Sequence, residues 1–309
     1  MTAAPPLIVV AGATATGKTE LAIRLGEEVA AGGRSVAVIS ADSRQVFRGL
    51  DIGTAKASPE DRARVPHHGL DLVDPDQAFS VADFADHART VLRALAADDG
   101  VAILAGGTGL YLRAVARGLD TEALPSDPVV RAGLEDELTA GGLAPLAERL
   151  AVTAPRLAAT VDLANPRRVV RALEISTLAG DGPRPPARGY PGAVAWLGLT
   201  VATGVHNERI AARAQAQFDS GLLDEAQTLR DRFDPALRPF SAIGYREAWA
   251  VIDRELSLDD AIALDVRRNI AFAKRQRTWF RSEPDIAWLD ASDALPLEEA
   301  KDRIAPIIG

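Results

Sequence analysis

Residues 12–19 of the chain read GATATGKT and fit the pattern G-x-x-x-x-G-K-[ST] of a phosphate-binding loop. In such a loop, backbone N–H groups, a lysine ammonium and a metal-holding hydroxyl converge on two linked phosphates. A simple glycine-rich turn would not require Lys18 and Thr19 directly after Gly17. We therefore predict that the loop binds a phosphate-bearing ligand. The predicted binding residues are Gly12, Ala13, Thr14, Ala15, Thr16, Gly17, Lys18 and Thr19.

A second group of polar residues, Asp42, Ser43, Arg44 and Gln45, follows the second predicted strand. In a doubly wound parallel sheet, ligands bind outside the carboxyl ends of the strands, so Asp42 is expected on the same rim as the phosphate loop. A carboxylate there can hold a magnesium ion through water or accept a proton from a nucleophile. The alternative is an aspartate that only caps a turn.

The third predicted strand ends in the turn Gly106-Gly107-Thr108-Gly109. Small residues let a ligand approach the backbone, and Thr108 adds a hydroxyl. The strand lacks the terminal aspartate that most ATP-hydrolysing phosphate-loop proteins use for magnesium, which counts against a motor ATPase. The chain also lacks the Asn-Lys-x-Asp signature of guanine recognition, which counts against a GTPase.

Positive charge is concentrated between residues 265 and 281, although the net charge of the chain is −8. The segment holds one acid, Asp265, and interleaves Trp279 and Phe280 with its cations. On a helix, three of the cations recur every seven residues, and such a stripe suits a polyphosphate or an RNA backbone. A solvated helix face is the alternative interpretation. The cations are Arg267, Arg268, Lys274, Arg275, Arg277 and Arg281.

The elements that position these motifs predict an α/β fold. Short apolar segments alternate with amphipathic ones, which indicates a P-loop NTPase-like parallel sheet with helices on both faces. Strands are expected at residues 7–11, 35–40, 101–105, 193–201 and 286–289, and helices at 18–30, 80–97, 110–117, 206–219, 222–232 and 258–281.

The middle of the chain shows no strand pattern. Helical runs at residues 129–140, 145–151 and 166–178 lead into a stretch rich in proline and glycine at 180–192. We predict that residues 1–118 and 193–309 form a catalytic core, and that residues 119–192 form a helical insertion attached through a mobile linker.

Composition indicates a protein of the reducing cytosol. Cysteine is absent, which excludes disulfides and thiolate zinc sites, and the four histidines are too scattered to suggest a metal site. No apolar run approaches the roughly 20 residues that span a bilayer, and the N-terminus lacks a basic-then-apolar signal. We predict a cytoplasmic protein with no membrane partner.

A series of motifs, in order from residue 7 to about residue 281, resembles the bacterial-type tRNA dimethylallyltransferases, the IPP transferase family. The resemblance implies transfer of a dimethylallyl group from dimethylallyl diphosphate to the N6 amine of adenosine 37 in tRNA anticodon loops, with Mg²⁺ and release of diphosphate. The motif DSRQVFRGLDIGTAK is far more specific to this family than the phosphate loop. The motifs read GATATGKT, DSRQVFRGLDIGTAK, HHGLDLVDP with FSVADF, GGTGLYL, NPRRVVRALE, AIGYRE and AKRQRTWFR.

The resemblance also implies roles for individual residues. Asp42 would accept the proton of the adenine amine, Thr19 would hold magnesium, and Arg209 would clamp the diphosphate. The acceptor base must leave its stack before a prenyl donor can reach it. The residues implied to contact tRNA are Asp42, Ser43, Arg44, Gln45, Thr108, Arg167, Arg168, Val169, Val170 and Arg171.

Three other functions remain open at this point. A phosphate-loop kinase for a small metabolite or nucleotide would use Asp42 as a base toward a hydroxyl, but it leaves the basic segment unexplained. A prenyltransferase for free adenine nucleotides would be shorter and would lack the insertion. An RNA-binding module would leave Lys18, Thr19 and Asp42 without a role. The expected partners are tRNA and dimethylallyl diphosphate, and the expected state is a monomer.

Overall fold

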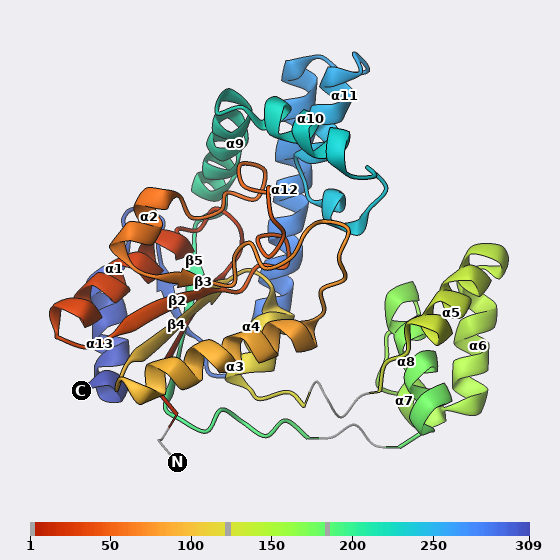
Figure 1. Cartoon of the computed structure of the whole chain (residues 1–309), viewed down its shortest axis with the longest axis horizontal. Coiled ribbons are helices and arrows are strands. Elements are labelled where there is room, and N and C mark those ends of the chain that lie inside the picture. Colours follow the sequence, from red (N-terminus) through yellow and green to blue (C-terminus); the bar gives the residue numbers. More distant parts are fainter. Residues whose placement is uncertain (1–3, 121–124, 183–185) are drawn as a thin grey trace. The chain divides into compact units, whose positions relative to one another are not determined.

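The computed structural model of the chain describes residues 4–120, 125–182 and 186–309. Within these residues the centre is a six-stranded parallel sheet in the order β3-β2-β4-β1-β5-β6 (Figure 1). The predicted parallel α/β fold is confirmed. The strands are β1 (Leu7–Gly12), β2 (Val36–Ser40), β3 (His67–His68), β4 (Val101–Gly106), β5 (Val194–Thr200) and β6 (Ala287–Asp290).

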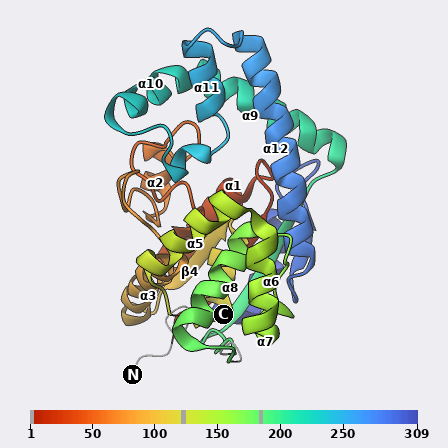
Figure 2. The ribbon, with the colours of Figure 1, turned by 90° about the vertical axis from the view of Figure 1, so that its right-hand side faces the viewer.

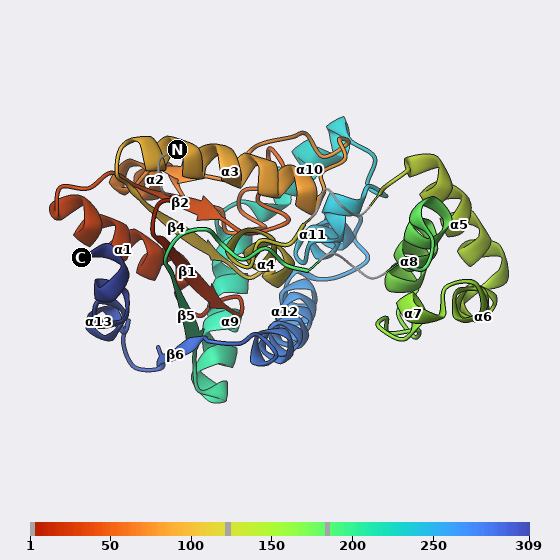
Figure 3. The ribbon, with the colours of Figure 1, turned by 90° about the horizontal axis from the view of Figure 1, so that it is seen from below.

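Helices cover both faces of the sheet. Helices α1 and α13 pack beside each other against one face, which includes Ile8 and Ile103, and α3 and α4 pack against the other, which includes Val9 and Leu104 (Figure 3). Neighbouring strand residues such as Ile8 and Val9 enter different cores because successive side chains of a strand point to opposite faces. The helices of this group are α1 (Lys18–Ala31), α2 (Pro59–Arg64), α3 (Val81–Ala97), α4 (Gly109–Ala116) and α13 (Leu297–Ile308).

A further group of helices follows β5. The long helix α12 packs against α9 and α11, and its Phe280 belongs to the core on one face of the sheet (Figure 2). The basic segment predicted between residues 265 and 281 therefore lies on a helix, as expected. The group consists of α9 (Thr203–Asp219), α10 (Leu222–Arg232), the 3-10 helix η1 (Arg238–Ser241), α11 (Tyr245–Ile252) and α12 (Leu258–Arg281).

Contacts divide the chain into two compact units, residues 1–118 with 189–309 and residues 119–188. The smaller unit is helical in its described part and has its own core, which includes Leu150, Val169 and Leu173 (Figure 2). The sequence analysis places the second boundary at residue 192 instead of 188, and residues 183–185 of its linker lie outside the described residues. The helices are α5 (Pro128–Gly141), α6 (Leu143–Thr153), α7 (Pro155–Ala158) and α8 (Pro166–Ala179).

The predicted helices and strands are all present, with ends within three residues of those expected. The sequence analysis missed β3, α2, α7, α11 and α13. Strand β3 is two histidines long, too short for an alternating pattern, and exists because it pairs with Val38 and Ile39 of β2. No helix in the described ranges is both long enough and apolar enough to cross a membrane.

Candidate active site at the phosphate loop

The phosphate loop connects β1 to α1. Gly17, with a φ of 93°, adopts the left-handed conformation that favours glycine, and it caps α1 so that Lys18 is the first helical residue. The first N–H groups of the helix therefore have no partner within the helix and point at the loop. Thr19 is exposed in this first turn. A helix start of this kind is a ready anion site, which suits a phosphate.

Lys18 brings a cation into the loop. Its Nζ donates to the carbonyl oxygen of Ala13 at 2.5 Å. The pKa of Lys18 is lowered to about 7, mainly by burial and also by the nearby charge of Arg213, while the charge of Asp42 opposes both effects. No ion pair of Lys18 with a carboxylate is found among the described residues. The loop thus holds a lysine whose positive charge is incompletely neutralised.

Thr14 in the loop is held by side chains from distant elements. Arg213 Nη1 donates to its hydroxyl at 2.8 Å, and its own N–H donates to Gln276 Oε1 at 2.9 Å. The His206 ring lies between its carbonyl and Arg277, with both contacts at 2.8 Å. Since Arg277 can only donate, His206 Nδ1 accepts and Nε2–H donates to Thr14. Burial lowers the pKa of His206, which fits this neutral ring.

The sequence analysis did not assign His206, Arg213 or Gln276 to the loop. One signal was available, because His206 and Arg213 are seven residues apart and share a face of α9. Their target is far away in the sequence, however, since 192 residues separate His206 from Thr14. A local pattern can show that two side chains share a helix face, but not which loop they reach.

Arg209, predicted to clamp the diphosphate, has other contacts. Its Nη1 and Nη2 donate to the carbonyl oxygens of Ala291 and Ser292, each at 2.8 Å, in the segment between β6 and α13. Arg213, one helical turn later, is the arginine of α9 that touches the loop. Of these two arginines, the structure brings Arg213 into contact with the loop, while Arg209 holds the segment after β6, and the diphosphate clamp at Arg209 remains a prediction.

Asp42 follows β2 and lies half-buried at the rim that bears the loop. Burial lowers the pKa values of both Lys18 and Arg213, and the charge of Asp42 opposes that change in each, which places the carboxylate close to both cations. Its Oδ1 accepts a hydrogen bond from the N–H of Arg44 at 2.8 Å. That contact is the turn cap considered as an alternative, and it uses only one of the two carboxylate oxygens.

The turn after β4, which contains Thr108, is hydrogen-bonded to the segment after β2, which contains Asp42 and Ser43. The N–H of Ser43 donates to Thr108 Oγ1 at 3.0 Å, which ties the chain after Asp42 to the turn after β4. From the other side, Gln276 Nε2 donates to the carbonyl of Gly107 at 3.0 Å. The structure therefore brings together the phosphate loop, Asp42, Ser43 and Thr108, as the rim argument predicts.

Arg44 and Gln45, predicted to contact tRNA, are bonded within the protein. Arg44 Nη2 donates to Ser241 Oγ at 2.8 Å. Gln45 Oε1 accepts from Ser40 Oγ at 2.7 Å, and its Nε2 donates to the carbonyl of Thr54 at 3.0 Å. Both side chains stabilise the loop after β2. Their contact with a base remains a prediction, and for Gln45 it would require an exchange of these bonds.

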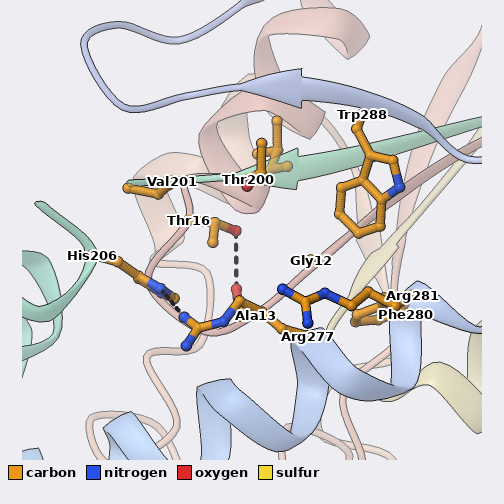
Figure 4. Close-up of a pocket in the computed structure, with 11 residues that line it drawn as sticks. Gly12, Ala13, Thr16, Thr200, Val201, His206, Arg277, Phe280, Arg281 and Trp288 are labelled. Carbon is orange, nitrogen blue, oxygen red and sulfur yellow. Dashed lines mark hydrogen bonds between the residues drawn. The ribbon is translucent and has the colours of Figure 1, made fainter. Parts of the chain in front are cut away.

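A pocket of about 340 Å³ opens beside the phosphate loop, between the ends of β5 and α12. Arg277 and Arg281 contribute guanidinium groups to its wall, while Val201, Phe280 and Trp288 contribute apolar surface (Figure 4). Gly12, Ala13 and Thr16 of the loop also line it. This mixture of cationic and apolar walls suits an amphiphilic anion.

The predicted tRNA segment of α8 divides into two faces. Arg167 and Arg168 are exposed, whereas Val169 and Val170 are buried in the core of the helical unit. Arg171 donates to Glu174 Oε2 at 2.7 Å and to the carbonyl of Pro125. The prediction that the side chains of Val169 and Val170 contact tRNA is therefore wrong, because adjacent apolar residues on this face pack inward.

Comparisons with known proteins agree on one family. The model of the IPP transferase family, described as "IPP transferase", matches residues 45–283. The tRNA dimethylallyltransferase of Roseiflexus sp. (strain RS-1) is 41% identical over 297 residues, which cover 93% of this chain and 94% of that protein. The tRNA dimethylallyltransferase of Thermus thermophilus is 42% identical and covers 91% of both chains.

Solved structures give the same result. A crystal structure of the full-length tRNA isopentenylpyrophosphate transferase from Bacillus halodurans has a TM-score of 0.71 and 36% identity, and covers 98% of this chain and 96% of that one. A eukaryotic dimethylallyltransferase acting on tRNA has a TM-score of 0.78 at 24% identity, which supports the fold alone. Taken with the phosphate loop and the neighbouring strand-end motifs, these similarities show that the chain belongs to the IPP transferase family.

Proposed function

We propose that the chain transfers a dimethylallyl group from dimethylallyl diphosphate to the N6 amine of adenosine 37 in tRNA anticodon loops. The names of its relatives, tRNA dimethylallyltransferases, support this class of reaction. One observation carries the proposal: Lys18 and Arg213 both contact the phosphate loop, neither forms an ion pair within the described residues, and the charge of Asp42 acts on both.

The cations suit the departure of diphosphate. In the transfer, the bond between C1 of the donor and the bridging diphosphate oxygen breaks, and the oxygen keeps the electron pair. Lys18 and Arg213 would neutralise the negative charge that develops on that oxygen, aided by the N–H groups at the start of α1. Such groups are effective because they are already oriented before the reaction.

The residues at this site fit a magnesium ion that arrives with the donor. Among the described residues, no group of three or more His, Cys, Asp or Glu side chains could hold a metal by itself. Magnesium commonly uses one or two protein oxygens together with phosphate oxygens and water. The hydroxyl of Thr19 would serve as such a ligand. When bound, the ion would add positive charge at the diphosphate.

Asp42 would act as the base. The adenine amine is a weak nucleophile, because its lone pair is delocalised into the ring, and it must lose a proton as the N6–C1 bond forms. The carboxylate of Asp42 has one oxygen in the turn cap, which leaves the other to accept that proton. The transfer then balances: the proton moves to Asp42, and diphosphate leaves.

Exposed cations would bind the tRNA. Arg267, Lys274 and Arg281 of α12 are exposed, as are Arg167 and Arg168 of α8. Phosphate contacts of this kind give affinity without sequence preference. We also propose that the protein acts as a monomer in the cytoplasm, where its tRNA substrate would be available.

Transfer of label tests the function. We expect purified protein with radiolabelled dimethylallyl diphosphate and magnesium to label an unmodified tRNA with adenosine 37. The matched control is the same tRNA with guanosine at that position, which offers no adenine amine and should stay unlabelled. Labelling of free AMP instead of tRNA would contradict the proposal in favour of a nucleotide prenyltransferase. ATP consumption with a small metabolite, without transfer, would favour a kinase.

A further inference from the structure

Phe272 is an exposed aromatic residue on α12, with 38% of its surface accessible. Among the described phenylalanine and tryptophan residues, only Phe272 and Trp288 are exposed, and Trp288 lines the pocket beside the phosphate loop. Phe272 does not belong to the hydrophobic cores formed by the described residues. Part of its ring is therefore accessible to a ligand.

Helix geometry places Phe272 on the strip of α12 that reaches the turn after β4. Gln276 and Trp279 follow Phe272 by about one and two helical turns, and residues at these spacings share a face. Gln276 donates to the carbonyl of Gly107. The Trp279 ring packs so closely on Gly109 that a Cβ there would lie 2.2 Å from it.

That turn belongs to the proposed acceptor side of the site. Its Thr108 accepts a hydrogen bond from the N–H of Ser43, the residue after Asp42. Gln276 also accepts from the N–H of Thr14, so the same strip of α12 contacts the phosphate loop. Phe272 is thus the exposed end of a strip whose other members are packed against the reaction site.

The surroundings of the ring are cationic. Arg275 lies over it, with Cζ 5.7 Å from the ring centroid. No hydrogen bond or ion pair of Arg275 is found in the part of the chain that the structure describes. Arg267 and Lys274 are exposed on the same helix. An aromatic face beside unpaired cations is the combination that binds single-stranded nucleic acid, since the ring stacks on a base and the cations meet phosphates.

We infer that Phe272 is a stacking platform for a nucleobase of the acceptor RNA, an inference that rests on the proposed function. Extraction of the acceptor adenosine leaves its neighbours in the loop without a stacking partner. The ring of Phe272 replaces that partner for one of them, and Arg275 pairs with a phosphate. Because every base has a π-face, this platform tolerates different bases.

Binding of a fluorescent anticodon stem-loop RNA to the full-length chain tests the inference. We expect Phe272→Ala to raise the Kd for the RNA by about 5-fold or more, the range of base–aromatic stacking. Phe272→Leu should be nearly as weak, because it keeps apolar volume and loses the π-face, while Phe272→Trp should retain wild-type affinity. Leu258→Ala is the matched control, since Leu258 is 42% exposed on the same helix.

The salt dependence separates stacking from charge. For Phe272→Ala, the plot of log Kd against log salt should shift without a change in slope, whereas Arg275→Ala should lower the slope by about 0.7, the value of one phosphate contact on a single strand. Full affinity in Phe272→Leu, a change of less than about 5-fold in Phe272→Ala, or an altered slope in Phe272→Ala would overturn the inference. Transfer of label by the wild-type chain is measured in parallel, so failure of the proposed function is recognised separately.

Discussion

The two compact units each contain a cluster of buried charge, and the clusters differ in whether the charges are paired by direct contact. In the helical unit, Glu174 is completely buried and accepts hydrogen bonds from Arg131, Arg171 and the N–H of Asp127. Burial alone would raise the pKa of Glu174, but the hydrogen bonds from Arg171, Asp127 and Arg131 hold it below the ordinary value. Every charge in this cluster has a partner.

The cluster at the phosphate loop is different. Burial lowers the pKa of both Lys18 and Arg213, and the charge of Arg213 lowers that of Lys18 as well. Asp42 opposes the change in both, and Asp265 opposes it in Arg213, but the pKa values stay lowered. The comparison teaches that a buried cluster whose charges are paired by direct contact serves the fold, whereas buried cations without an ion pair are suited to a ligand of the opposite sign.

The largest effect should come from Asp42, the carboxylate that acts on both cations of the loop cluster. We expect Asp42→Ala to lower the single-turnover transfer rate by about 10²- to 10⁴-fold, the usual contribution of a general base, with little change in the Kd of the donor. Asp42→Asn is the sharper variant, because its Oδ1 can still cap the turn at Arg44. Near-normal transfer by Asp42→Asn would show that the turn cap, and not proton transfer, is the role of this residue.

Two arginines of α9 test which cation belongs to the cluster. Arg213→Ala should weaken binding of dimethylallyl diphosphate by about 10- to 100-fold, the value of a charge-assisted hydrogen bond. Arg209→Ala should leave that Kd nearly unchanged, because its guanidinium holds the carbonyls of Ala291 and Ser292. Titration of each variant with dimethylallyl diphosphate in a calorimeter measures the two Kd values and shows which arginine binds the donor. A larger loss in Arg209→Ala would restore the diphosphate clamp that the family resemblance implies.

The directly paired cluster around Glu174 should matter for stability and not for chemistry. Glu174→Gln keeps the size of the side chain but leaves Arg131 and Arg171 without a counter-charge. We expect it to lower the free energy of unfolding of the helical unit by about 2 kcal/mol. Hydrogen exchange of residues 125–182 measures this loss, with the exposed Glu135→Gln as control. A slower transfer step at saturating tRNA would refute the division between the two clusters.

The comparison also explains how much could be predicted from the sequence. The phosphate loop, its strand and its helix are contiguous, so the pattern from Gly12 to Thr19 and the apolar run before it were sufficient. Asp42 and Thr108 follow strands of the same sheet, and the rule for strand ends placed them on one rim. Each of these predictions needed only local patterns and a general property of parallel sheets.

The remaining parts of the site depend on tertiary contacts. Gln276 and Thr14 are 262 residues apart, and Arg213 and Thr14 are 199 apart, so no local pattern joins them. The error at Val169 and Val170 has another cause, because both were included with a basic motif although they lie beside buried residues of the same helix. Helical periodicity would have separated them from Arg167 and Arg168.

The smallest expected effect is the uptake of a proton by Lys18 when the donor binds. With a pKa of about 7, roughly nine-tenths of Lys18 is uncharged at pH 8 in the free protein. A bound diphosphate favours the ammonium and raises this pKa, so binding at pH 8 should take up close to one proton per donor. The sign follows from linkage: affinity should fall as the pH rises above about 7, because protonation becomes part of binding.

Calorimetry in HEPES and in Tris at pH 8 measures this proton, since the two buffers release it with different heats. The observed enthalpy should differ between the buffers for the wild-type chain and for Lys301→Met, which removes a half-buried lysine of α13 that is paired with Glu28 and Glu298. For Lys18→Met the difference should vanish. Arg213→Ala should reduce it, because loss of the repulsive charge raises the pKa of Lys18 before binding. Equal enthalpies for the wild-type chain in both buffers would mean that binding takes up no proton, which would contradict a lowered pKa of Lys18 that the donor raises.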